Sequence, residues 1–233
     1  MESERSENLK KYAFEFLTIF IGIFAAFALD NWKENRKDQQ TEIKILTEIS
    51  NGLVKDLDDI NINEMGHKQG LEATKFFRNL ITTPQIKTSS PAFLYFNLFR
   101  DFVSVQNTSG YETLKSKGLE IIENDSLRSN IISLYEYDYN ALRKLEENYS
   151  EIQFQESYFN EFNRSLAPNF TFDKKGDING INSPIKIPEN EKKILMVDLW
   201  KIEKNRRFML QYYSVVKVKI KKLQEEIIRE LKK

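Results

Sequence analysis

The apolar stretch from Tyr12 to Leu29 constrains the fold of this chain more than any other feature. It reads YAFEFLTIFIGIFAAFAL and holds one charged residue, Glu15, in a chain of which 30% is charged. Eighteen helical residues extend about 27 Å, close to the hydrocarbon thickness of a bilayer. Tyr12 and Trp32 stand where interfacial aromatic residues belong. The sequence therefore predicts a polar leader over residues 1–11 and a transmembrane helix over residues 12–32.

The same stretch admits two other interpretations. One is a cleaved signal peptide, because Ala26-Phe27-Ala28 fits the small-x-small cleavage pattern. The mature chain would then be a secreted or periplasmic helical binding protein. Against this, the leader lacks the basic character of a signal peptide, since it carries Glu2, Glu4 and Glu7. The other is a buried core helix, because the uncharged run from Phe16 to Leu29 has only fourteen residues.

Small residues line one face of the predicted span. Thr18, Gly22 and Ala26 recur at intervals of four, which lets two helix backbones approach closely in lipid. We therefore predict self-association, although a generic anchor with incidental small residues would show the same pattern. The predicted association face consists of Glu15, Thr18, Gly22, Ala25, Ala26 and Leu29.

The predicted interfacial anchors flank the span on both sides. They are Lys10, Lys11, Tyr12, Trp32 and Arg36. Glu15 lies less than one turn inside the span, where its carboxylate can reach the headgroups. In an alternative interpretation, Glu15 lines a bundle of spans in an oligomeric channel or an ion-coupled membrane component. Basic residues are nearly balanced across the span, so they do not decide its orientation.

The remainder of the chain predicts an all-α fold, in which the transmembrane helix continues into long antiparallel helices, as a coiled-coil-like bundle. No Pro occurs between Trp32 and Pro84, so a stalk should reach about residue 80. We expect a helical stalk and bundle over residues 33–166, an irregular loop over 167–190 and a long basic helix over 191–233.

Shorter elements are expected within residues 33–166. A loop over residues 82–91 precedes an aromatic-rich helix over 92–103. Ser109 and Glu112 fit a capping box at the start of a short helix. A further helix is expected from residue 126 to 166, capped by Asn124 or Asp125.

The predicted final helix carries a coiled-coil-like apolar seam over four heptads, interrupted by Arg206. Its partner is either the stalk of the same chain or another copy. From Lys201 to Lys233 there are eleven basic and four acidic residues, a net charge of +7 in a chain whose total is zero.

An antiparallel return of this helix would bring its lysines to anionic headgroups or to an acidic partner. Anionic lipid favours a cytoplasmic soluble portion. In the alternative interpretation, the charges meet acidic neighbours within the same protein. The lysines concerned are Lys217, Lys219, Lys221, Lys222, Lys232 and Lys233.

Residues that commonly carry catalysis are scarce. The chain has no Cys, which excludes disulfides, thiolate metal sites and Cys nucleophiles, and His67 is its one histidine. Glu64-x-x-His67 matches one arm of a di-iron site, but that chemistry needs a second histidine. We therefore expect a structural role for His67.

Sequence motifs of enzymes are also absent. The chain has no P-loop, no dinucleotide-binding glycine motif and no nucleophile elbow. The pairs Asp58-Asp59 and Glu146-Glu147 read as solvated helix faces. DKKGD, residues 173–177, lacks the remaining ligands of a calcium loop. No nucleic-acid recognition module is visible. The sequence predicts no enzyme, no cofactor, no metal site and no nucleic-acid partner.

Two blocks carry a resemblance to a known family. The first is YAFEF with Gly22 and NWKENR, and the second is SGYETLKSKGLEIIENDSLRSNIISLYE, residues 109–136. Together they resemble a family of uncharacterised bacterial proteins with one N-terminal membrane span and a helical soluble domain. The resemblance implies location and architecture, and it transfers no catalytic residues.

These observations favour a noncatalytic scaffold or sensor, anchored by a single span in the bacterial inner (plasma) membrane. We expect it to contact membrane lipid, to form a homo-oligomer and to bind a protein partner that the sequence does not identify.

Overall fold

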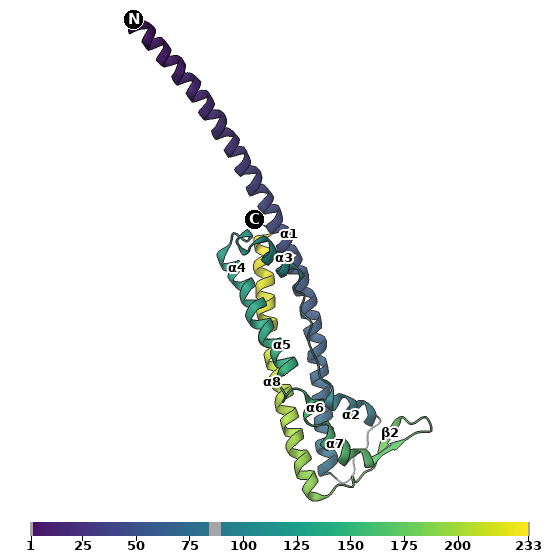
Figure 1. Ribbon diagram of the computed structural model, residues 1–233. Helices are drawn as coiled ribbons and strands as arrows, with labels where there is room; N and C mark the ends of the chain where they lie inside the picture. The colour runs from purple at the N-terminus through teal and green to yellow at the C-terminus, as the bar shows by residue number, and fades with distance from the viewer. Residues whose placement is uncertain (1, 84–89, 233) are drawn as a thin grey trace.

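A computed structural model describes the backbone of residues 2–83 and 90–232, and side chains from Tyr12 onward except that of Ala13. The longest element is α1, Glu2–Thr82, an unbroken helix of 81 residues. In Figure 1 its N-terminal half leaves the rest of the molecule and stands alone. The prediction that the apolar segment runs straight into a helical stalk is confirmed. The fold is mostly helical, as predicted.

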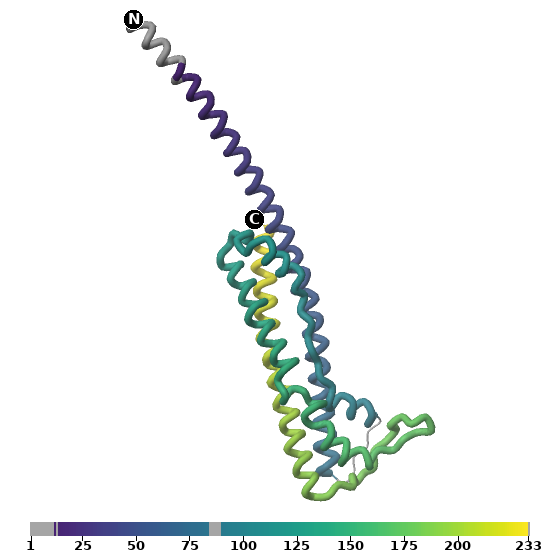
Figure 2. Tube along the Cα trace, viewed as in Figure 1, coloured from purple at the N-terminus to yellow at the C-terminus, as the bar shows by residue number. Residues whose placement is uncertain are grey.

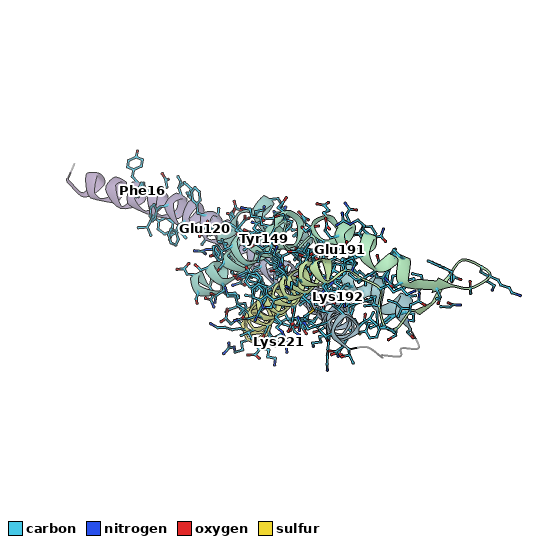
Figure 3. All side chains as sticks on the ribbon, turned by 90° about the horizontal axis from the view of Figure 1, so that it is seen from below. Phe16, Glu120, Tyr149, Glu191, Lys192 and Lys221 are labelled. Carbon is cyan, nitrogen blue, oxygen red and sulfur yellow. The ribbon has the colours of Figure 1, made fainter. Side chains whose placement is uncertain are left out.

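The exposed part of α1 is also its most apolar part. Every described side chain from Tyr12 to Gln40 is exposed, and Figure 3 shows Phe16 projecting away from the bundle. This helix is long and apolar enough to cross a membrane, and its apolar window is 0% buried. The absence of burial removes the interpretation as a core helix, because a core helix would pack against the protein.

The C-terminal half of α1 packs antiparallel to α8, Glu189–Glu230. As the tube in Figure 2 traces, the chain turns after the C-terminal end of α1 and runs back along the bundle toward the bare part of α1. It then returns to the distal end and finally runs back once more through α8. The intervening helical elements are α2 (Pro91–Phe99), α3 (Ser109–Lys117), η1 (Leu119–Ile121), α4 (Asp125–Ile132), the π-helical η2 (Ser133–Asp138), α5 (Tyr139–Asn148), α6 (Phe154–Ser157), α7 (Phe159–Leu166) and η3 (Ala167–Asn169).

The segment predicted as an irregular loop, residues 167–190, contains a small antiparallel hairpin. Its strands are β1, Phe170–Phe172, and β2, Ile178–Ile181, with Phe170 opposite Ile181. The carboxylate of Asp173 accepts hydrogen bonds from the backbone N–H groups of Lys175 and Asp177, which closes the turn. The Asp173 carboxylate is thus used within the turn.

The predicted helix over residues 126–166 is wrong in its extent, because α5 ends at Asn148 and the chain bends before α6. A tertiary contact favours the bend: the backbone N–H of Phe154 donates to Oδ1 of Asp101 at 3.1 Å. The cap of α4 is confirmed, since Oδ1 of Asn124 accepts from the N–H of Leu127 at 3.2 Å.

The predicted capping box at Ser109 is wrong. Thr108 occupies the N-cap position, and its backbone carbonyl accepts from the N–H of Glu112 at 2.8 Å. Ser109 is the first helical residue, and its hydroxyl donates to Oδ1 of Asn107. The Ser109 hydroxyl is therefore used by a neighbouring side chain, and no side-chain hydrogen bond caps the start of α3. The predicted loop over residues 82–91 lies largely outside the described residues, but Pro91 does begin α2.

The hydrophobic core is divided into two clusters along the bundle. The cluster nearer the bare part of α1 includes Met209 and Tyr213, and the distal cluster includes Ile202 and Leu199. Between them on α8 lies Arg206, which is 0% exposed. The residue that interrupts the predicted seam therefore marks a buried polar layer between two apolar cores.

Candidate functional site

An open pocket of about 830 Å³ lies at the end of the bundle distant from the bare part of α1. Phe77 of α1 stands beside Tyr95 of this pocket, with ring centroids 6.2 Å apart. At 1.5 Å per residue, Phe77 lies about 68 Å along α1 from Trp32. We name this cavity the distal pocket; its lining is Ala92, Tyr95, Phe96, Phe99, Arg100, Asp101, Gln155, Phe159, Phe172, Gly176, Asp177 and Ile178.

Five of the twelve residues that line the distal pocket are aromatic. Phe99 meets Phe159 edge to face at 5.6 Å, and Tyr95 meets Phe170 at 4.8 Å. The Tyr95 hydroxyl donates to Oδ1 of Asn163 at 3.0 Å, which links α2 to α7. Phe99 is in the core, whereas Phe96 is 60% exposed at the pocket.

A few polar groups converge on this apolar wall. The guanidinium of Arg100 lies 5.1 Å from the centre of the Phe96 ring and 5.7 Å from that of Phe102. Burial raises the pKa of the Asp101 carboxyl to about 6, although the N–H of Phe154 and the charge of Arg206 oppose that rise. Apolar walls with few convergent polar groups are typical of small-molecule sites.

Arg206 of α8 connects the C-terminal end of α2, which forms the floor of the distal pocket, to the bundle. Its Nη2 donates to three backbone carbonyls at the end of α2, those of Asn97, Leu98 and Arg100, at 3.1, 2.9 and 3.1 Å. A cation is favoured at these orphan carbonyls by the helix dipole. The guanidinium also stacks on Phe154 at 4.4 Å. Burial lowers its pKa to about 10, which leaves it charged at neutral pH.

His67 of α1 completes the polar layer from the opposite side. Its Nδ1 lies 3.3 Å from Nη1 of Arg206, so Nδ1 acts as an acceptor toward the guanidinium. Burial, aided by the charge of Arg206, lowers the pKa of His67 to about 3, and the ring is neutral. His67 is 1% exposed, in agreement with the structural role expected from sequence.

Two glycines of α1 make room for this layer. A Cβ at Gly70 would lie 2.3 Å from Cζ of Arg206, and one at Gly66 would lie 2.0 Å from Cζ of Phe102. Their role is close approach, because any larger side chain would overlap a buried group. Glycine lowers helix propensity at these two positions, and the contacts with Phe102 and Arg206 offset that loss.

An extended segment, residues 100–108, runs from the distal pocket to the opposite end of the bundle, which lies nearer the bare part of α1. Because the segment is not a strand of a sheet, its backbone N–H groups need other partners. Carboxylates supply them: Ser104 donates to Glu146 at 3.0 Å, Val105 to Asp59 at 2.9 Å and Asn107 to Asp56 at 2.7 Å.

Two of these carboxylates, those of Glu146 and Asp56, are buried. Glu146 also accepts from the Tyr213 hydroxyl at 2.6 Å, and Asp56 from the Tyr139 hydroxyl at 2.6 Å. Burial raises the pKa of both Glu146 and Asp56. The prediction that the Glu146-Glu147 and Asp58-Asp59 pairs are solvated is thus wrong for Glu146, which is 1% exposed, and for the bonded Asp59.

The predicted association face lies on the bare part of α1. Glu15, Thr18, Gly22, Ala25, Ala26 and Leu29 are all exposed. A Cβ at Gly22 would meet no atom within 4 Å. Among the predicted anchors, Arg36 lies 5.5 Å from the Trp32 ring, while the side chains of Lys10 and Lys11 fall outside the described residues. The face is geometrically open, and its association stays a prediction.

The six predicted contact lysines do not form one belt. Lys217 pairs with Glu64 at 3.1 Å, and Lys219 with Asp138 at 2.6 Å. Glu64 lies about 48 Å along α1 from Trp32, so for these two lysines the alternative of internal acidic neighbours is confirmed. Lys221, Lys222 and Lys232 are exposed, and Lys233 lies outside the described residues.

The described residues offer little for catalysis. They contain no group of three or more His, Asp or Glu that could hold a metal ion. The one histidine is enclosed beside a cation. What the arrangement can do is bind, through an open aromatic pocket whose floor is fixed to α8 and α1.

Comparisons with known proteins found a family match. The model of one family, a family of unknown function (DUF6090), matches residues 15–171. No curated protein and no solved structure matches the chain.

Proposed function

The chain belongs to the DUF6090 family, and we propose that it is a noncatalytic, membrane-anchored sensor or scaffold. The apolar segment of α1 crosses the membrane once, and the rest of α1 holds a helical module beyond it. The module binds a small apolar ligand in the distal pocket. It also binds a protein partner, and copies of the chain associate through the association face.

The observation that carries this proposal is that one unbroken helix, α1, includes both the apolar segment and the part that supports the distal pocket. Its first half is bare and apolar, as lipid contact requires, and its second half supports the distal pocket. Helices are stiff over this length, so the module stands at a fixed distance from the bilayer. An enzyme would need a set of catalytic side chains close together, whereas this arrangement suits a binding module that is held away from the bilayer.

The chemistry of the distal pocket indicates the class of ligand. Its volume falls in the range of small-molecule sites, roughly 300–1,000 Å³. Rings of Tyr95, Phe96, Phe99, Phe159 and Phe172 offer faces and edges for stacking. The Arg100 guanidinium at the wall favours a ligand with a negatively charged group. The ligand is therefore an aromatic or otherwise apolar molecule. Any acidic group that it carries lies at Arg100 and away from Asp101 and Asp177 of the same lining.

A ring-bearing sulfonate dye tests the pocket. We expect 1-anilinonaphthalene-8-sulfonate to bind the full chain in nanodiscs saturably, with a blue-shifted emission. Phe96→Ser should weaken binding about tenfold, since the ring contributes both stacking and its contact to Arg100. Phe93→Ser is the matched control, because Phe93 is 53% exposed on the same helix and does not line the pocket. Equal dye binding by both variants would exclude the pocket.

Membrane anchoring has its own test. The full chain should stay in the membrane fraction after an alkaline carbonate wash, with its N-terminal segment intact by mass spectrometry. Release by carbonate, or a mature chain that starts after Ala28, would refute the anchor. Protease access to the module in spheroplasts reports its orientation, which we propose to be cytoplasmic; digestion from outside would refute that orientation.

A further inference from the structure

The outward face of α8 has an unusual composition for a solvated helix surface. Its exposed apolar residues lie within an arc of about 120°, at 100° per residue. We name this set the outer face; it consists of Ile194, Val197, Trp200, Phe208, Val215 and Val218, each 45–64% exposed. A solvated helix face normally carries polar residues instead. Scattered apolar residues are ordinary, whereas a stripe along one helix indicates a binding surface.

The charges around the outer face have one sign. Residues 193–222 are all described, and none of their exposed side chains is acidic. This range has two acidic residues: Asp198 is buried, and Glu203 bonds Arg78 at 2.5 Å and Arg207 at 2.9 Å. The exposed charged residues are all basic: Arg207 and Lys219 pair with Glu203 and Asp138, and the others are Lys193, Lys204, Lys221 and Lys222. At 100° per residue, Lys193, Lys204 and Lys222 lie within the same arc as the apolar residues. The surface therefore combines exposed apolar side chains with interspersed lysines.

We propose that the outer face docks an acidic amphipathic helix of another protein. The apolar residues follow α8 over about six turns, which suits a partner helix laid along its length. Acidic residues interspersed with the apolar residues of that partner would meet Lys193, Lys204 and Lys222, and such complementarity sets partner choice and orientation. Trp200, with Lys204 5.7 Å from its ring centre, is the central aromatic anchor.

A second copy of the chain fits this surface poorly. In the proposed membrane-anchored arrangement, two copies stand parallel, so a two-fold contact would place the outer face against itself. Lys204 would then face Lys204 of the other copy, and Lys222 would face Lys222. Like charges at such positions destabilise a helix pair.

A lipid surface also fits poorly. α8 runs antiparallel to α1 (Figure 1), and on the proposed function α1 crosses the bilayer. The axis of α8 therefore points toward the membrane, and its outer face cannot lie flat on the membrane that anchors it. An interfacial helix must lie in the plane of the headgroups. The face is available to a soluble or peripheral acidic partner.

A pair of designed peptides tests the proposal on the full chain in nanodiscs. Each peptide has about four heptads with Leu at positions a and d, and Glu in one peptide is replaced by Lys in the other. In a Trp32→Phe background, Trp200 is the sole tryptophan, so its emission reports occupancy. We expect a blue shift with the Glu peptide and at least tenfold weaker binding of the Lys peptide.

Variants separate the apolar from the charge contribution. Phe208→Lys should weaken binding of the Glu peptide about tenfold, and Lys204→Glu with Lys222→Glu should shift preference toward the Lys peptide. Ile62→Lys is the matched control, since Ile62 is 61% exposed on α1, and it should leave binding unchanged.

Three results would overturn the proposal. The first is equal binding of both peptides, and the second is an unchanged Trp200 emission. The third is occupation of the face by another class of partner: a dimer, seen by light scattering, that Phe208→Lys disrupts, or a Trp200 shift with anionic vesicles alone. Dye binding to the distal pocket is independent of these outcomes, so failure of the docking face does not count against the proposed function.

Discussion

The substitution Arg206→Met tests whether the buried guanidinium holds the distal pocket together. It removes the donor to the carbonyls of Asn97, Leu98 and Arg100 and leaves the end of α2 without a partner. Each buried carbonyl left unsatisfied costs about 1–3 kcal/mol. Relief of the desolvation of the charge offsets part of that sum. We expect a net loss of about 3–5 kcal/mol in the free energy of unfolding, the magnitude typical of breaking a buried charged contact.

Thermal unfolding of the full chain in detergent, followed by circular dichroism, measures this loss. For a chain of this size, 1 kcal/mol corresponds to about 2–4 °C in Tm, so Tm should fall by roughly 6–20 °C. Arg207→Met is the matched control: Arg207 is the next residue of α8, is exposed and pairs with Glu203 at 2.9 Å. Its loss should stay below about 1 kcal/mol.

A stable Arg206→Met protein would refute the reasoning. If its Tm equals or exceeds that of the parent chain, the cost of burying the guanidinium outweighs its three hydrogen bonds, and α2 is held by apolar packing alone. Hydrogen exchange provides a second readout. Amides of residues 97–104 should exchange faster in Arg206→Met than in Arg207→Met, because the floor of the distal pocket loses its connection to α8.

Three further outcomes are expected. Gly66→Ala should lower stability by about 1–3 kcal/mol in urea unfolding, because its Cβ would overlap Phe102; Phe102→Ala in the same chain should recover part of the loss, and additive losses would argue against the overlap. The pKa of Asp101 is raised to about 6 in the folded state, so the folded state holds this proton more tightly and stability falls as pH rises from about 4 to about 6; Asp101→Asn should flatten stability curves over that window, and an unchanged slope would contradict the assignment. Gly22→Ile should reduce detergent-resistant oligomers if the association face packs closely, whereas unaltered oligomer size would reject that face.

Glu15 separates the anchor from the channel alternative. It is exposed on the bare helix, and nothing in the described residues favours a pore. Glu15→Gln should therefore leave ion leak from proteoliposomes unchanged. A changed leak would favour the channel.

The long helices could be predicted from sequence because their signals are local and periodic. The apolar run of the span needs only residue types, and the seam of α8 needs only spacing. Short elements failed for the opposite reason. The hairpin of β1 and β2 has strands of three and four residues, too few to show alternation, and its signal was hidden among loop residues.

The distal pocket and the polar layer could not be predicted, because their parts are distant along the chain. Arg206 was visible as an interruption of the seam, but its three carbonyl partners lie more than a hundred residues earlier. From sequence, Glu146 reads as one half of a solvated pair. In the structure its carboxylate is buried and accepts hydrogen bonds from Ser104 and Tyr213, which are distant in the sequence. Gly66 and Gly70 looked like weak points of a helix, whereas they receive Phe102 and Arg206.

The unbroken course of α1 between Lys33 and Gln40 has a geometric consequence. Each residue added there would advance the module by about 1.5 Å and turn it by about 100° about the helix axis. The orientation of the distal pocket and α8 about the axis of α1, relative to Gly22, therefore depends on the number of residues between them. An insertion of seven residues nearly restores that direction, whereas an insertion of two points the module almost backwards.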